Sequence, residues 1–209
     1  MVSDAPQPAE STEPRQITLA ILAGGAGSRM GAPKGSLLLH GRPILEYLLD
    51  RFAWLGPTML VLAPGIDRPA GAERFGQVVG DPTRGLGPLR GVLTALEHAT
   101  TDITVVTTVD MPQISQTHLL WIGGKLNGLR GACGAMGLRS TGQVEPFPSA
   151  YRASAASAIA RELAEARRAV HGLLRRDGFL AIEAPGNWPL AIWTNLNTPA
   201  DVKDFHAGL

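Results

Sequence analysis

Short apolar runs of strand length alternate with amphipathic helix patterns along this chain, and this alternation constrains the fold more than any other feature. The run Ile17–Leu22 is almost unbroken, as expected of a parallel strand that is buried on both faces. After Arg42-Pro43, apolar residues recur at helical spacing at Ile44, Leu45, Leu48, Leu49, Phe52 and Leu55. Strands that alternate with helices predict an α/β fold in three layers, with a mostly parallel central sheet covered on both sides.

The same alternation continues to the C-terminus. We expect further strands at residues 59–63, Gln77–Gly80, 103–109, 131–137, 143–151 and 190–194. We expect further helices at Pro88–His98, Gln116–Gly128, 153–166, 169–177 and 199–206. The pattern is less regular beyond Gly131, so some of these later strands could run antiparallel.

Length and composition indicate a single globular domain. At 209 residues the chain fits one domain, which we place at residues 16–209, after a proline-rich tail at residues 1–15 that we expect to be disordered. Nineteen Lys and Arg against 18 Asp and Glu give a net charge of +1, which argues against nucleic acid as a partner. With Cys133 as the only cysteine and no apolar run near the ~20 residues that cross a bilayer, we expect a cytoplasmic protein without membrane contact.

A glycine-rich stretch follows the strand Ile17–Leu22. It contains Gly24, Gly25, Gly27 and Gly31 together with the cations Arg29 and Lys34. Glycines let backbone approach phosphate and the cations supply charge, so the stretch is typical of a polyphosphate loop. Met30 breaks the dinucleotide fingerprint, and Gly35 after Lys34 breaks the Walker motif. An ordinary tight turn is the alternative.

Two aspartates follow other predicted strands. Asp81 comes after Gln77–Gly80 and could accept hydrogen bonds from a base or a ribose, while Asp110 follows the seven-residue, mostly apolar strand at 103–109. A carboxylate at that depth is costly unless it is paired or bound to metal, and Mg²⁺ is commonly held by one or two carboxylates plus substrate phosphates. Asp110 is therefore our magnesium candidate. Turn or capping roles remain the alternative for both aspartates.

Arginines gather in one late stretch, at Arg161, Arg167, Arg168, Arg175 and Arg176. This cluster is either a solvated helix face or a basic rim that receives an anionic substrate or a partner protein. The five histidines have no metal-ligand spacing, and Cys133 in its glycine-alanine setting is typical of a small core residue.

Several of these residues together resemble the MobA-type molybdenum cofactor guanylyltransferases. The matching segments, spread over residues 17–205, are Leu22-Ala-Gly-Gly, Arg29-Met-Gly, Lys34, Gly41-Arg-Pro-Ile-Leu45, Asp81, Gly87-Pro-Leu-Arg-Gly91, Asp110-Met-Pro112 and Asn195-Leu-Asn-Thr-Pro199. The resemblance implies a Rossmann-like nucleotidyltransferase fold that transfers GMP from GTP to the phosphate of molybdopterin, with Mg²⁺, and releases pyrophosphate. It also implies a nucleotide half at about residues 16–113, an acceptor half at about 114–209, and proteins that deliver or receive the cofactor.

The resemblance assigns site residues by position. It places Leu22, Ala23, Gly24 and Gly25 at the guanine pocket, Arg29 and Lys34 on the triphosphate, Asp81 on the nucleoside, Asp110 on Mg²⁺, and Asn195 and Asn197 on the acceptor side. Arg29, Lys34 and Asp110 are the expected catalytic residues. Read without the resemblance, Asn195 to Pro199 is a turn and a helix cap.

The chain also departs from the family pattern. Pro33 stands where family members often carry an acidic residue, and Leu62-Ala63-Pro64 offers only backbone where they carry asparagine. Gly24 and the segment Gly87–Gly91 favour guanine over cytosine. The alternatives are a cytidylyltransferase or another NTP transferase with a different phosphorylated acceptor, or a catalytically silent nucleotide-binding module on the same fold.

Overall fold

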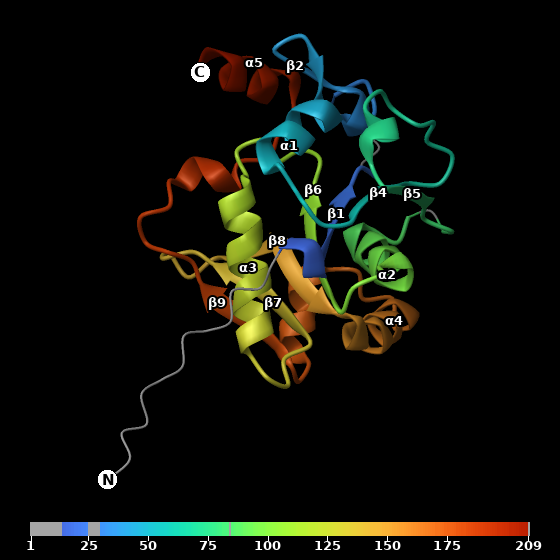
Figure 1. Cartoon of the computed structure of the whole chain (residues 1–209), viewed down its shortest axis with the longest axis vertical. Helices are drawn as coiled ribbons and strands as arrows, with labels where there is room; N and C mark the ends of the chain where they lie inside the picture. The colour runs from blue at the N-terminus through green and yellow to red at the C-terminus, as the bar shows by residue number, and fades with distance from the viewer. Residues whose placement is uncertain (1–13, 25–29, 84, 209) are drawn as a thin grey trace.

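A seven-stranded mixed sheet forms the centre of the computed structural model, which describes residues 14–24, 30–83 and 85–208 (Figure 1). The strands lie in the order β5-β4-β1-β6-β8-β7-β9. Their bounds are β1 Ile17–Leu22, β4 Thr58–Leu62, β5 Gln77–Gly80, β6 Ile103–Thr108, β7 Gly134–Leu138, β8 Val144–Arg152 and β9 Phe179–Glu183. In this sheet β8 alone runs opposite to the other strands, so the expected mostly parallel sheet with an antiparallel exception is confirmed.

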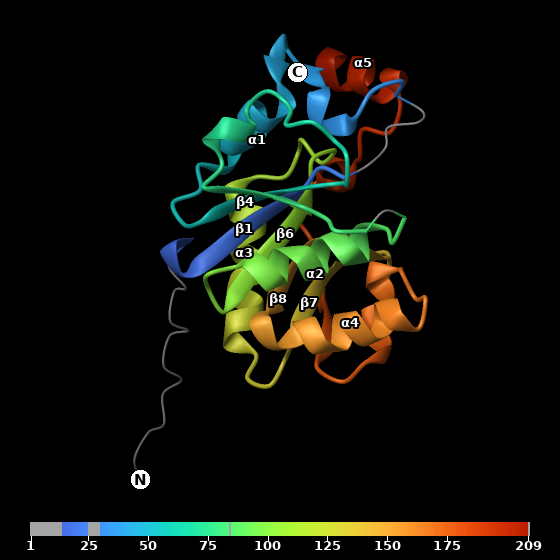
Figure 2. The same ribbon diagram turned by 90° about the vertical axis from the view of Figure 1, so that its right-hand side faces the viewer.

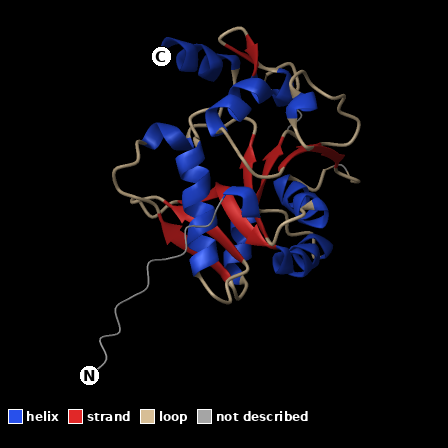
Figure 3. Ribbon diagram, in the orientation of Figure 1, coloured by secondary structure: helices blue, strands red, loops and turns tan. Residues whose placement is uncertain are grey.

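Helices cover both faces of the sheet and complete the three layers (Figure 3). They are α1 Ile44–Phe52, α2 Pro88–His98, α3 Gln116–Gly128, α4 Ala156–Ala164 and α5 Pro199–Ala207. Gly91 of α2 lies against Leu22, whereas Gly123 of α3 lies against Ile17 and Val105. Because Ile17 and Leu22 point to opposite faces of β1, α2 and α3 pack on opposite sides, and α4 lies beside α2 (Figure 2).

The remaining elements are short. Short 3₁₀ helices are η1 Pro14–Gln16, η2 Lys34–Ser36, η3 Ala72–Arg74, η4 Ala153–Ala155, η5 Val170–Arg175 and η6 Leu190–Trp193. Strands β2 Leu38–Leu39 and β3 Arg42–Pro43 form a separate two-stranded ribbon. The C-terminal helix α5 returns to this ribbon, where the rings of His206 and His40 lie 4.6 Å apart. The end of the chain therefore packs against its first half.

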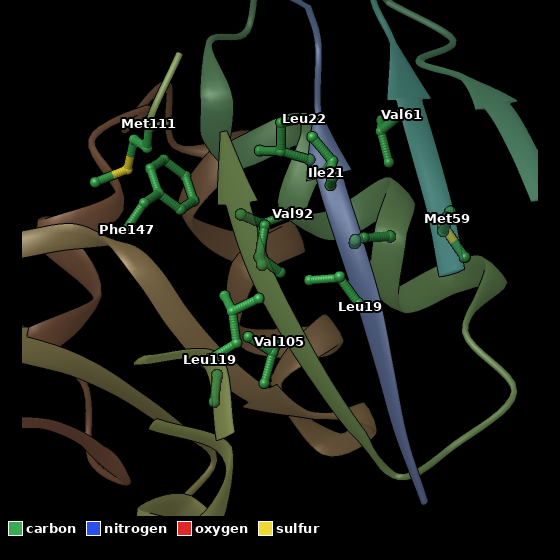
Figure 4. Packing of buried hydrophobic residues seen from close by; sticks show 14 of the residues in the cluster. Leu19, Ile21, Leu22, Met59, Val61, Val92, Val105, Met111, Leu119 and Phe147 are labelled. Atoms are coloured by element: carbon green, nitrogen blue, oxygen red, sulfur yellow. The ribbon is translucent and has the colours of Figure 1, made fainter. Parts of the chain in front are cut away.

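The buried core holds the strands from whose ends the loops at one edge of the sheet begin. Every residue of β1 is buried, as the unbroken apolar run predicts. Figure 4 shows Leu19 and Ile21 of this strand packed among apolar side chains from β4, β6 and the covering helices. The positions at which loops leave the carboxyl ends of these strands are therefore set by the packing of the core.

Four expectations for the later elements or helix ends are wrong. Leu55 is 69% exposed, because α1 ends at Phe52 and Ala53 adopts the left-handed conformation. The expected strand at 190–194 is instead the 3₁₀ helix η6, Leu190–Trp193, since Ile192 and Trp193 are buried in succession instead of alternating. The expected helix at 169–177 is only the 3₁₀ turn η5, and β9 was not expected, because as an edge strand it buries Phe179 alone.

The expected N-terminal tail and the expected lack of a membrane span concern residues that the structure describes only in part. The expected tail falls mostly on residues 1–13, which lie outside the described residues, and η1 begins at Pro14. Among the described residues, no helix combines the length and the apolar character that a membrane span requires.

Candidate active site

A cleft of about 700 Å³ opens at the carboxyl ends of the parallel strands. Its walls come from the ends of β1, β4, β5 and β6, from the loop before α2, and from β8. The lining residues are Leu22, Gly24, Lys34, Val61, Ala63, Pro64, Gly65, Ile66, Asp81, Thr83, Gly85, Leu86, Gly87, Pro88, Gly91, Thr108, Val109, Asp110, Phe147 and Asn195. This is the edge at which open α/β sheets bind ligands, and the cleft is large enough for a small-molecule substrate.

Lys34 and Asp110 meet at one end of this cleft. Lys34 is the first residue of η2, directly after Pro33, and its Nζ atom lies 2.5 Å from Oδ2 of Asp110. The other carboxylate oxygen, Oδ1, accepts a hydrogen bond of 2.6 Å from the hydroxyl of Thr108. Asp110 is 9% exposed, so its burial is compensated by an ion pair and a hydroxyl rather than by a turn or cap alone.

The C-terminal loop reaches the same point. Nζ of Lys34 also donates to Oδ1 of Asn197 at 2.7 Å, across 163 positions of sequence. The backbone amide of Leu196 donates to the carbonyl oxygen of Asp110 at 2.8 Å. Lys34 of η2, Asp110 after β6 and the late loop therefore form a single hydrogen-bonded group.

Asp81 lies on another side of the cleft, where α2 holds it. Its Oδ1 atom accepts a hydrogen bond of 2.5 Å from the hydroxyl of Thr94, which is fully buried. Nε of Arg90 donates to that hydroxyl in turn at 3.2 Å, and Arg90 is paired with Glu97. Burial raises the pKa of the Asp81 carboxyl, and the hydrogen bond from Thr94 opposes this rise.

Glycines bring α2 close to the end of β1. Gly87, directly before α2, has φ of +70°, which residues with a Cβ rarely adopt. A Cβ at Gly91 would lie 3.3 Å from both methyl groups of Leu22 and 3.7 Å from Oδ2 of Asp81. Small residues at these positions therefore let the helix approach the floor of the cleft while leaving room beside the Asp81 carboxylate.

The structure brings together most of the residues that the sequence singled out. Leu22, Gly24, Lys34, Asp81, Asp110 and Asn195 line the cleft. Asn197 contacts Lys34, whereas Ala23 is buried behind the lining beside Gly35. Arg29 and Gly25 lie outside the described residues, so their assignments remain predictions.

Sequence reasoning missed other contributors. The loop from Ala63 to Ile66 forms one wall, although the chain offers only backbone where the family pattern has asparagine; its Pro64-Gly65 pair is a turn signal that could have marked it. Phe147, on β8, brings an aromatic ring into the lining. Thr94 carries no sequence signal, because it lies among apolar residues on a helix.

The arginine-rich stretch divides into two kinds of residue. Arg167 and Arg176 donate to Glu162, which is 2% exposed, at 2.8 Å and 2.5 Å; they hold the pKa of that carboxyl below its usual range. Arg168 instead donates to the carbonyl oxygen of Gly85, in the loop that lines the cleft, at 2.8 Å. Arg168 thus braces the cleft wall, and the role of the stretch as a rim for an anionic substrate or a partner remains a prediction.

The oxygen atoms at Asp110 suit a hard divalent cation whose other ligands come from a bound substrate. The described residues contain no group of three or more His, Cys, Asp or Glu able to hold a metal ion by themselves. The Asp110 carboxylate, supported by the hydrogen bond from Thr108, supplies oxygen atoms, the donor type that Mg²⁺ prefers when phosphate oxygens and water complete its shell.

Solved structures with the same architecture identify the fold. Molybdopterin-guanine dinucleotide biosynthesis protein A from Archaeoglobus fulgidus superposes with a TM-score of 0.73 at 24% identity, covering 91% of this chain and 97% of that one. The 2-C-methyl-D-erythritol 4-phosphate cytidylyltransferase of Thermus thermophilus superposes with a TM-score of 0.67 at 20% identity, covering 92% and 98%. The fold is therefore the Rossmann-like fold of nucleotidyltransferases.

Sequence comparison gives the family within this class. The model of the MobA-like NTP transferase domain matches residues 19–179, and the chain belongs to this family. It is 33% identical over 189 residues to the molybdenum cofactor guanylyltransferase of Cereibacter sphaeroides, covering 87% of this chain and 91% of that protein. It is 30% identical over 190 residues to the probable molybdenum cofactor guanylyltransferase of Bacillus subtilis, covering 87% and 90%.

Proposed function

We propose that this protein transfers GMP from GTP to the terminal phosphate of molybdopterin and releases pyrophosphate. The observation that carries the proposal is the meeting of Lys34, Asp110 and Asn197 at the mouth of a cleft in a MobA-like NTP transferase. The names of full-length relatives from several organisms support the choice of nucleotide and acceptor. A silent nucleotide-binding module would have no need for the partly buried ion pair of lysine and aspartate at this position.

The end of the cleft near Asp81 is the place for the guanine base. The walls there are mainly apolar, with Leu22, Val61 and Leu86 available to pack against a planar ring. The Watson–Crick edge of guanine carries two neighbouring N–H donors, and the Asp81 carboxylate is an acceptor that can pair with them. Cytosine lacks this pair of donors, which supports GTP over CTP.

The chemistry needs no protein nucleophile. The acceptor phosphate, with a second pKa near ~6, is largely a dianion at neutral pH. One of its oxygen atoms attacks the α-phosphorus of GTP, a new P–O bond forms, and the bond from the α-phosphorus to the oxygen that bridges it to the β-phosphorus breaks. The electron pair leaves with pyrophosphate. The task of the protein is to align the two phosphates and to stabilise the charge that develops.

Particular residues would perform that task. Lys34 donates N–H groups to the triphosphate, and Arg29 adds a second cation. Asp110, with the Thr108 hydroxyl behind it, would hold Mg²⁺, which when bound neutralises phosphate charge. The loop of Asn195 and the wall formed by Phe147 face the remaining side of the cleft, where the acceptor would enter.

Three wider assignments belong to the same proposal. We assign residues up to about 113 to the nucleotide and the later residues mainly to the acceptor, and we place the reaction in the cytoplasm, where a chain with the single cysteine Cys133 remains reduced. Proteins that supply molybdopterin or take up the dinucleotide product are the expected partners.

Pyrophosphate release over a matrix of nucleotides and acceptors tests the proposal. GTP with molybdopterin and Mg²⁺ should give the fastest release, at least tenfold above CTP, ATP or UTP with the same acceptor. Preference for CTP would transfer the assignment to cytidylyl transfer, and faster release with a sugar 1-phosphate would replace the acceptor. No release with any pair would favour the silent module.

A further inference from the structure

The side chain of Asn197 lies on the lysine of the nucleotide site. The resemblance assigns Asn197 to the acceptor, yet its Oδ1 atom accepts a hydrogen bond of 2.7 Å from Nζ of Lys34. Its backbone amide donates to Oδ2 of Asp201 at 2.7 Å, and the neighbouring amide of Leu196 donates to the carbonyl oxygen of Asp110 at 2.8 Å. The asparagine is thus anchored on both sides and aimed at the ammonium group.

The capping of α5 explains this anchoring. Thr198 precedes the helix, its hydroxyl accepts from the backbone amide of Asp201, and the Asp201 carboxylate accepts in return from the amide of Thr198. The same carboxylate reaches one residue further, to Asn197. Hydrogen bonds from these two amides hold the pKa of Asp201 below its usual range, so they favour the charged form of the carboxylate that anchors the loop.

The two partners of Lys34 differ in charge. The carboxylate of Asp110, at 2.5 Å, cancels the field of the ammonium, whereas the neutral amide oxygen of Asn197 directs the ammonium and leaves its charge available. Lysine has a flexible side chain, and a hydrogen bond that holds its ammonium group in place lowers the entropy lost when a remaining N–H donor meets phosphate. Asn197 therefore has the properties of a group that orients a phosphate-binding lysine.

We propose that Asn197 is a positioning residue for the triphosphate, acting through Lys34, and that its contribution does not require the acceptor. This inference rests on the proposed function, because it assumes that Lys34 binds the phosphates of GTP. It assigns the late segment before α5 to nucleotide binding as well as to the acceptor side. Asn195, two positions earlier, lines the cleft without a hydrogen bond from its side chain in the described structure.

The test is a calorimetric titration of Mg²⁺-GTP and of GMP into the full chain without acceptor. Asn197→Ala should weaken GTP binding about tenfold, which corresponds to ~1.4 kcal/mol, and change GMP binding by less than about twofold. Lys34→Ala/Asn197→Ala should bind GTP no more weakly than Lys34→Ala alone, because both changes remove one interaction. Asn187→Ala, at an exposed asparagine outside the cleft, is the matched control and should bind like the parent chain.

A second substitution keeps the test decisive if Asn197→Ala does not fold. Asn197→Asp retains an oxygen acceptor but adds a negative charge beside Lys34, so it should weaken GTP binding by more than tenfold and GMP binding much less. The inference is overturned if Asn197→Ala or Asn197→Asp binds GTP like the parent chain. It is also overturned if the losses in binding free energy of Lys34→Ala and Asn197→Ala add in full in the double variant. The proposed function fails separately, if the parent chain itself binds no GTP.

Discussion

Lys34 is the residue on which the site depends most. Lys34→Met keeps the length of the side chain but removes its charge, and we expect turnover to fall on the order of 10² to 10³, as when one preorganised donor is deleted from an active site. The thermal midpoint should fall as well, by the equivalent of ~1–3 kcal/mol, because Asp110 loses a partner in a nearly buried position. Turnover and midpoint are measured on one preparation.

The exposed lysine of α5 gives the control for this prediction. Lys203→Met removes an equal charge far from any contact with the cleft lining and should change neither quantity. A Lys34→Met protein with the turnover of the parent chain would show that the lysine does not contact the triphosphate.

Asp81 makes nucleotide binding depend on pH. Because burial raises the pKa of its carboxyl, the group takes up a proton at a higher pH than an ordinary aspartate and then loses an acceptor for the base. GTP binding should weaken as the pH falls through this raised pKa. Asp81→Asn should weaken GTP binding about 10- to 100-fold at neutral pH, as expected for a hydrogen bond to a charged group, and remove the acid-dependent part.

The effect of Asp81 on folding stability changes with pH in the opposite direction to its effect on GTP binding. A raised pKa in the folded state means that the protonated form is favoured by folding, so this group contributes most below its unfolded pKa of about 3.9 and the contribution is lost as the pH rises through the folded pKa. At neutral pH Asp81→Asn should therefore leave the thermal midpoint unchanged or higher. A clear drop in the midpoint would indicate that the charged carboxylate stabilises the fold, against this account.

At the scale of elements, Glu162 ties α4 to the segment around η5. Arg167 and Arg176 surround its carboxylate, and their hydrogen bonds lower its pKa. Glu162→Gln should lower the free energy of unfolding by ~1–2 kcal/mol at neutral pH. This loss is small for two charged hydrogen bonds, because the side chains of Arg167 and Arg176 remain 42% and 39% exposed and water screens their charge. Denaturant unfolding measures this difference.

The pH dependence of the stability difference between Glu162→Gln and the parent chain shows whether the loss comes from charge or from packing. A lowered pKa gives stability that is present above the unfolded value of about 4.3 and is lost as the pH falls through the folded pKa. The gap between Glu162→Gln and the parent chain should therefore close in acid. A gap of equal size at acid and neutral pH would point to packing instead, and Glu183→Gln, at an exposed glutamate of β9, should show no gap at either pH.

Prediction of elements from the sequence succeeded where burial imposes a clear period. β1 is buried throughout and α2 and α3 present one apolar side to the sheet, so their patterns gave the observed bounds. β9 escaped because an edge strand with one buried residue has no alternation to detect. The segment at η6 was misassigned because its bulky apolar residues suit a strand, while Pro189 and tertiary packing favour a turn.

At the scale of the whole molecule, topology assembles the site. Residues after three strands could be placed at one edge from sequence, because parallel strands end together, and Leu22, Asp81 and Asp110 do line one cleft. The contacts of Thr94 with Asp81 and of Asn197 with Lys34 could not be predicted, since they depend on how α2 and the C-terminal loop pack. The charged groups of the site could thus be predicted from the sequence. The neighbours that orient these groups depend on how distant elements pack.

The most direct measurement of the central claim follows the phosphorus atoms of GTP. The protein is incubated with Mg²⁺, molybdopterin and GTP labelled with radioactive phosphorus either at the α-phosphate or at the γ-phosphate. Cleavage between the α- and β-phosphates predicts that the α label enters the dinucleotide product and that the γ label leaves in pyrophosphate, with equal amounts of each. Label from the γ-phosphate in the molybdopterin product, or α label that stays in free nucleotide while molybdopterin is unchanged, would contradict guanylyl transfer.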